Sequence, residues 1–92
     1  MAKKHICKSQ IILRINGEKV YGKTYEGEEP KYYDDAVAEA DPITAAIIRA
    51  VPHQTGATVE YVDMEPWKGQ IRKAESCGVA YEVRFRYTGW EN

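Results

Sequence analysis

Two arginines near the end of the chain alternate with large apolar residues in the stretch YEVRFRYTGW, residues 81–90. The planar guanidinium group of arginine matches the geometry of phosphate and carboxylate groups. Successive side chains of a strand point to opposite faces, so Arg84 and Arg86 would share one face while Val83 and Phe85 face the core. The spacing indicates a basic surface that contacts phosphates, bases or acids.

Adjacent acidic pairs are a second candidate for chemistry. Glu28-Glu29 and Asp34-Asp35 lie in what we call the acidic segment, residues 26–41, which holds seven acids and one base. Paired carboxylates can hold a metal or perform acid–base work, whereas acids at the start of a helix serve as caps on a solvated face. We favour the solvated face, and leave open that the segment binds a basic partner.

The residue types of a metal site or an active site occur, but not in a recognisable arrangement. His5, Cys7, His53 and Cys77 are four potential zinc ligands, yet their spacing matches no compact zinc motif. The glycines are scattered, and the two serines lie in no nucleophile-elbow pattern. We therefore expect no enzymatic activity, no metal, no cofactor and no small-molecule substrate.

Length and composition predict one small globular domain over residues 1–92, with 43% hydrophobic and 29% charged residues. The net charge of −1 conceals an asymmetry, because the residues outside the acidic segment hold seven acids and twelve bases. No stretch approaches the ~20 apolar residues that span a bilayer, and no signal peptide is apparent. We expect a cytoplasmic protein that does not bind a membrane and whose Cys7 and Cys77 stay reduced.

The stretch IILRINGEKVYGKTY, residues 11–25, predicts a β-hairpin. Asn16-Gly17 favours the positive φ angles of a two-residue type I′ turn. That turn would pair Leu13 with Val20 and Ile12 with Tyr21. One face would then be apolar, and the other would be basic with an apolar centre, carrying Gln10, Ile12, Arg14, Lys19, Tyr21 and Lys23.

The remaining helices and strands are predicted from the period of the apolar residues and from residues that begin or end such elements. We expect helices at about 34–40 and 42–51, broken at Asp41 but sharing one apolar stripe of Ala36, Ala40, Ile43, Ile47 and Ala50. A strand is expected at about 58–64. Trp67, Ile71 and Ala74 predict a helix within 66–77 that stops at Cys77-Gly78, although Gly69 weakens it and the segment could instead be a loop with one helical turn. The last strand runs from Val79 to about Thr88.

The order ββααβαβ predicts an α+β fold: an antiparallel sheet of the hairpin and two further strands, with helices on one face. The other face should be open to water. If the last strand lies next to the hairpin, Arg84 and Arg86 join the basic residues of the hairpin. Such a face is either simply solvated or binds a partner, and the sequence leaves both interpretations open.

The whole chain resembles the small phage-encoded anti-CRISPR proteins in profile: one small α+β domain, no catalytic motif, a divided charge map and seven tyrosines. The stretches that carry the resemblance are IILRINGEKVYGKTY, EGEEPKYYDDAVAEAD and YEVRFRYTGW. No residue motif defines that group, so the resemblance assigns no site residues. It implies an inhibitor in the host cytoplasm that binds a host protein or ribonucleoprotein, such as a CRISPR surveillance complex, and touches its RNA or DNA.

Two functions are therefore expected. The first is a non-enzymatic binding protein that inhibits a nucleic-acid-guided defence complex. The alternative is a small RNA- or DNA-binding domain that uses the open basic face. The candidate partner-binding residues are Arg14, Lys19, Tyr21, Lys23, Arg84 and Arg86 on the sheet, and Glu28, Glu29, Asp34 and Asp35 in the acidic segment.

Overall fold

The computed structural model describes residues 6–89. Within this range the chain forms five strands, two α-helices and one 3-10 helix. In chain order they are β1 (Cys7–Ile15), β2 (Glu18–Gly27), α1 (Tyr33–Ala38), α2 (Pro42–Ala50), η1 (Val51–His53), β3 (Thr58–Met64), β4 (Trp67–Ser76) and β5 (Val79–Thr88).

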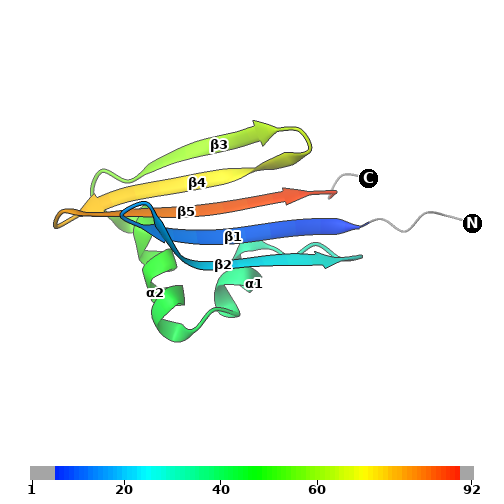
Figure 1. The fold of residues 1–92 in the computed structure, drawn as a ribbon, viewed down its shortest axis with the longest axis horizontal. Coiled ribbons are helices and arrows are strands. Elements are labelled where there is room, and N and C mark those ends of the chain that lie inside the picture. Colours follow the sequence, from blue (N-terminus) through cyan, green and yellow to red (C-terminus); the bar gives the residue numbers. More distant parts are fainter. Residues whose placement is uncertain (1–5, 90–92) are drawn as a thin grey trace, which may run out of the picture.

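The strands form one antiparallel sheet in the order β2-β1-β5-β4-β3, with β2 and β3 at its two edges (Figure 1). The helices pack on one face, because the sheet residues in the core all belong to one set of alternating positions. The core consists of Ile11, Leu13, Ala36, Val37, Ala45, Ile48, Val51, Ala74, Val83 and Phe85. The predicted α+β class, antiparallel sheet and one-sided helices are confirmed.

Two tight turns of the same kind connect neighbouring strands. Asn16 and Gly17 have φ angles of 53° and 81°, and Cys77 and Gly78 have 52° and 77°. Positive φ at both central positions is the signature of the type I′ turn, whose twist suits two adjacent antiparallel strands. The predicted hairpin at Asn16-Gly17 is confirmed, and Cys77-Gly78 forms a second one that the sequence analysis interpreted as a helix stop.

The register of the first hairpin differs from the prediction. Ile15 pairs with Glu18 beside the turn, but an irregularity lies between Leu13 and Arg14, so that Leu13 pairs with Tyr21 instead of the predicted Val20. Val20 is the extra residue of a β-bulge, and its side chain is 53% exposed. Because strand side chains alternate, this one-residue shift exchanges the two faces of β2 beyond the bulge.

The segment from Pro66 to Cys77 was predicted to hold a helix, and that prediction is wrong. It forms β4, which makes the sheet five-stranded, with three strands beyond the first hairpin. β4 pairs with β5 along its length, from Lys68 with Tyr87 to Ser76 with Val79. The apolar residues at steps of four and three imitate a helix, but the second hairpin supplies hydrogen bonds that local propensity does not predict.

The two helices occur where they were predicted, and Asp41 separates them. The Asp41 carboxylate caps α2 by accepting a hydrogen bond from the Thr44 backbone N–H at 2.9 Å. The prediction that both helices share one apolar stripe is wrong, however. Ala45 and Ile48 are buried in α2, whereas Ile43 is 75% exposed, because the extended residue at 41 ends the phase of α1.

Candidate partner-binding face

β5 lies in the middle of the sheet and positions the two arginines of interest. Arg84 pairs with Ile12 of β1 on one side and with Ile71 of β4 on the other. Arg86 pairs in the same way with Gln10 and Gly69. The sequence left it open whether the last strand lies next to the hairpin; β5 pairs with β1, and this places Arg84 and Arg86 on the same face as Arg14.

The face opposite the helices is called here the open face. Its alternating positions carry Gln10, Ile12, Arg14, Lys19, Glu60, Val62, Met64, Trp67, Ile71, Lys73, Glu82, Arg84 and Arg86. Ile12 is only 8% exposed on this face, with Arg84 beside it. Long side chains such as arginine can cover apolar surface with their stems while the charged ends stay in water. Ile12 is thus the apolar centre that was predicted for the basic face.

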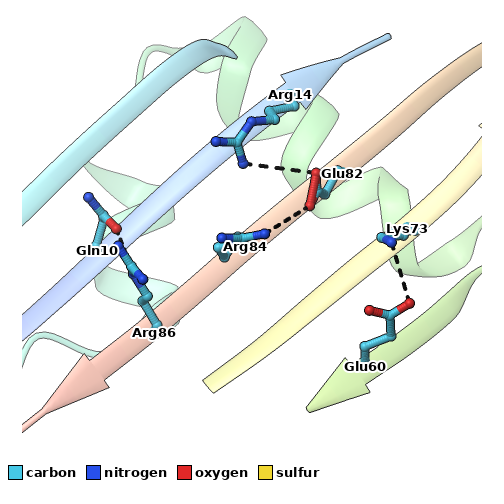
Figure 2. A network of polar contacts seen from close by, with 7 residues as sticks. All are labelled: Gln10, Arg14, Glu60, Lys73, Glu82, Arg84 and Arg86. Carbon is cyan, nitrogen blue, oxygen red and sulfur yellow. Dashed lines mark hydrogen bonds and ion pairs between the residues drawn. The ribbon is translucent and has the colours of Figure 1, made fainter. Parts of the chain in front are cut away.

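An acidic residue lies between two of the arginines. Glu82 forms one ion pair with Arg14, with 3.9 Å between Arg14 Nη1 and Glu82 Oε2, and another with Arg84, with 3.6 Å between Arg84 Nη2 and Glu82 Oε1 (Figure 2). Further along the sheet, Lys73 Nζ lies 3.3 Å from Glu60 Oε1. These pairs reduce the net positive charge, so the open face alternates in sign.

Arg86 is held by contacts on both sides. Its Nε donates a hydrogen bond of 2.7 Å to Gln10 Oε1, and its guanidinium carbon lies 4.6 Å from the centre of the Trp67 ring. Gln10 in turn donates from Nε2 to Thr24 Oγ1 at 3.2 Å. The chain of contacts from Trp67 to Thr24 crosses four strands and fixes the direction in which Arg86 presents its donors.

A hollow of about 320 Å³ lies at the β3–β4 side of this arrangement. Apolar residues and the two arginines share its wall, which is formed by Tyr61, Val62, Asp63, Met64, Trp67, Ile71, Arg84 and Arg86. Aromatic residues, methionine and arginine are the types that protein interfaces enrich. The hollow can therefore accept an apolar or planar group from a partner while the arginines contact an acid or a phosphate beside it.

Two of the predicted site residues are not on this face. The bulge turns Tyr21 and Lys23 to the helix side, where Tyr21 packs against the core. Lys23 Nζ lies 4.0 Å from Glu39 Oε1 and 5.4 Å from the centre of the Tyr25 ring. The prediction that both residues contribute to the basic face is wrong, while Arg14, Lys19, Arg84 and Arg86 share it.

The acidic segment lies on the helix side. Glu28 and Glu29 follow β2 and are exposed, and Asp34 and Asp35 are exposed in the first turn of α1. Neither aspartate caps the helix, since the N-cap position is Tyr32, whose side chain makes no cap hydrogen bond. The first-turn acids still favour the helix through its dipole. The two candidate surfaces are thus on opposite faces of the sheet.

Lysines from β2 and the acidic segment surround Tyr25 on that helix side. Lys31 forms an ion pair with Glu39, and its Nζ lies 5.2 Å from the centre of the Tyr25 ring. Burial, the nearby Glu39 carboxylate and Tyr21 raise the pKa of Tyr25 to about 12. The hydrogen bond from Lys31 lowers the pKa of Glu39. Lys23 and Lys31 thus pair with Glu39 and lie against the Tyr25 ring on the helix side.

The three potential zinc ligands that lie within residues 6–89, Cys7, His53 and Cys77, do not converge. Cys7 is buried at the start of β1, with Sγ 3.5 Å from the Gly89 carbonyl oxygen, and Cys77 is exposed in the turn at the other end of the sheet. His53 is exposed in η1, and His5 lies outside the described residues. Within residues 6–89, no three His, Cys, Asp or Glu side chains are placed to hold a metal.

Sequence reasoning missed several residues of this site. Trp67 and Ile71 were assigned to a helix, Gln10 was placed on the basic face without a role, and Glu82 was not singled out. Gly69 was the available signal: between Trp67 and Ile71 it weakens a helix, and it occupies the strand position beside Arg86.

Comparisons of the chain with models of protein families, with curated proteins and with solved structures found no match. None of the helices within residues 6–89 has the length and apolar composition needed to cross a membrane.

Proposed function

We propose that the chain is a non-enzymatic binding protein that inhibits a nucleic-acid-guided host defence complex by covering one of its surfaces with the open face. The observation that carries the proposal is the fixed position of Arg86 between Trp67 and Gln10, at the wall of an apolar hollow. Binding energy in interfaces concentrates on arginine, tryptophan and tyrosine residues that are already ordered before the partner arrives.

The charge pattern supports a protein or ribonucleoprotein partner over naked nucleic acid. Glu82 and Glu60 lie among the cations of the open face and pair with Arg14, Arg84 and Lys73. Binding to nucleic acid gains affinity from each phosphate that a free cation neutralises. A face of alternating sign fits a partner that presents both signs, because electrostatic complementarity selects it. The defence complex as partner, and the host cytoplasm as location, rest on the resemblance to anti-CRISPR proteins.

Inhibition is tested by expressing the chain in a panel of bacterial strains, each of which carries one nucleic-acid-guided defence and is challenged with a phage that the defence targets. We expect phage plating to recover in one strain and to stay unchanged in the matched strain without the defence. The purified complex should also be retained by the immobilised chain. No recovery in any strain, together with no retained complex, would refute the proposal.

The alternative function is a small domain that binds RNA or DNA directly. The stacked Arg86 and Trp67 favour it, since a nucleobase could occupy the hollow next to them and stack on the exposed aromatic surface. Fluorescence anisotropy with single-stranded RNA and DNA at several salt concentrations distinguishes the two. Tight binding of protein-free nucleic acid that weakens steeply with salt would favour the alternative.

A further inference from the structure

The two edges of the sheet differ in how they are protected. β3 is exposed on both faces, and its large apolar side chains extend into solvent: Val59 is 48% exposed, Tyr61 78% and Met64 74%. Its pairing with β4 is uninterrupted from Thr58 to Met64. The outer side of this strand is an unpaired edge within the described residues, of a type that readily adds another strand.

The opposite edge, β2, carries the features that prevent strand addition. It contains the bulge at Val20, the lysines Lys19 and Lys23, and two glycines, Gly22 and Gly27. Bulges, lysines and weak strand formers are the usual protection of an exposed edge. The β3 sequence TVEYVDM has no lysine, proline or glycine and consists largely of residues that favour strands. Glu60 and Asp63 are the only charged residues of β3, so its edge is less protected against strand addition than that of β2.

We propose that β3 pairs antiparallel with β3 of a second copy of this chain, which joins the two sheets into one. Centred on Tyr61, the pairing places Tyr61 opposite Tyr61 of the second copy. Thr58 then faces Met64, Val59 faces Asp63, and Glu60 faces Val62, so that all seven residues of the strand are paired.

Charge and the length of the pairing favour this register, because centring on Val62 also separates the carboxylates but pairs only residues 60–64. With Tyr61 at the centre, each carboxylate of β3 lies opposite an apolar residue of the other copy. Centring on Glu60 or on Asp63 instead would place two identical carboxylates opposite each other, which destabilises a strand pair. The strand is thus complementary to itself, as a twofold interface requires.

The arrangement is compatible with the rest of the fold. A twofold axis perpendicular to the sheet keeps both open faces on one side and both sets of helices on the other. The helices pack under β1, β5 and the neighbouring part of β4, and β3 is exposed on both faces, so the edge is accessible (Figure 1). Val62 and Met64 line the hollow, so the second copy would place its Glu60 and Thr58 at the rim.

Sedimentation or light scattering over a concentration series tests the pairing. We expect a concentration-dependent dimer for the parent chain. Tyr61→Lys places two cations opposite each other in the centre and should weaken the dimer by roughly tenfold or more. Val20→Lys is the matched control, because it changes an exposed apolar residue on the other edge strand to the same cation, and it should leave the dimer unchanged.

Cysteine crosslinking tests the register and does not depend on partner binding. In a Cys77→Ser background, Tyr61→Cys should oxidise to a disulfide-linked dimer, because directly opposed strand residues have the Cα separation that a disulfide needs. Val59→Cys should not, because position 59 lies opposite position 63. A chain that stays monomeric at the highest soluble concentration, a dimer insensitive to Tyr61→Lys, or equal crosslinking at both positions would overturn the proposal.

Discussion

The guanidinium carbon of Arg86 lies 4.6 Å from the centre of the Trp67 ring, although the two residues are on different strands and nineteen positions apart in the sequence. The stack exists because Arg86 pairs with Gly69, which has no side chain to separate the arginine from the indole. It turns an arginine that could be merely solvated into one with a fixed direction.

This stack should be measurable as a coupling between the two residues. We expect Trp67→Ala and Arg86→Ala to be non-additive in the free energy of unfolding, with an interaction of about 0.5–1 kcal/mol. Urea denaturation of the parent, both single variants and the double variant gives the value. Additive effects would mean that the guanidinium and the indole are neighbours without a stabilising contact.

Gly69 should be intolerant of a side chain. A Cβ at this position would collide with the backbone of Phe85 and Arg86 across the strand pair. We expect Gly69→Ala to lower the free energy of unfolding by about 1–3 kcal/mol, as for other overpacked sites.

Gly27→Ala is the matched control for this substitution. Gly27 is also a strand glycine without positive φ, and its Cβ would meet only the Glu29 carbonyl oxygen, at 3.9 Å. The change should stay within about 0.5 kcal/mol. Equal stabilities of the two variants would contradict the close approach of β4 and β5.

The cap of α2 should make stability depend on pH in the acid range. Hydrogen bonds from the Thr44 side chain and backbone hold the pKa of the Asp41 carboxyl below its usual value. A lowered pKa in the folded state stabilises the protein above the unfolded-state pKa, and the benefit disappears as the pH falls through the folded-state pKa. Asp41→Ala should therefore lower the melting temperature at pH 7, by an amount that shrinks below about pH 4.

Asp41→Asn separates the cap from the charge. Asparagine caps a helix about as well as aspartate, and its amide oxygen does not titrate in this range. Its melting temperature should exceed that of the alanine variant at pH 7. A loss as large as that of alanine would show that the hydrogen bond to Thr44 contributes little.

Two strands and one turn could be predicted from the sequence. Residues 58–64 and 79–88 form strands with the predicted bounds, and the positive φ of Asn16 and Gly17 follows from their residue types. The strand 79–88 has a clear two-residue period, the strand 58–64 follows a loop signal, and the Asn-Gly turn is a local signal as well.

What the sequence did not reveal depends on contacts between distant residues. The bulge at Val20 moves Tyr21 and Lys23 to the helix side, and it leaves no local mark. β4 was assigned to a helix because Trp67, Ile71 and Ala74 have helical spacing, whereas pairing with β5 decides its conformation. The stack on Arg86 could not be foreseen once Trp67 had been placed in a helix.

The charged residues divide between the two faces of the sheet. The sequence indicated a basic set and an acidic set of residues. The structure places Arg14, Lys19, Arg84 and Arg86 on the open face and the acidic segment on the helix side. It does not follow from the sequence that Glu82 neutralises part of the basic set, because that requires β1 beside β5.

The most direct test is a paired charge reversal on the two faces, followed by binding of the partner complex to the immobilised chain. Arg84→Glu with Arg86→Glu adds repulsion where the open face would touch a phosphate or an acid. Asp34→Lys with Asp35→Lys makes the same number of reversals on the helix side. If the arginine double variant does not fold, Arg86→Gln removes the charge alone, and circular dichroism verifies the fold of each variant. We expect the folded arginine variant to lose the partner and the aspartate variant to retain it. A folded arginine variant that binds as well as the parent would contradict the proposed role of the open face.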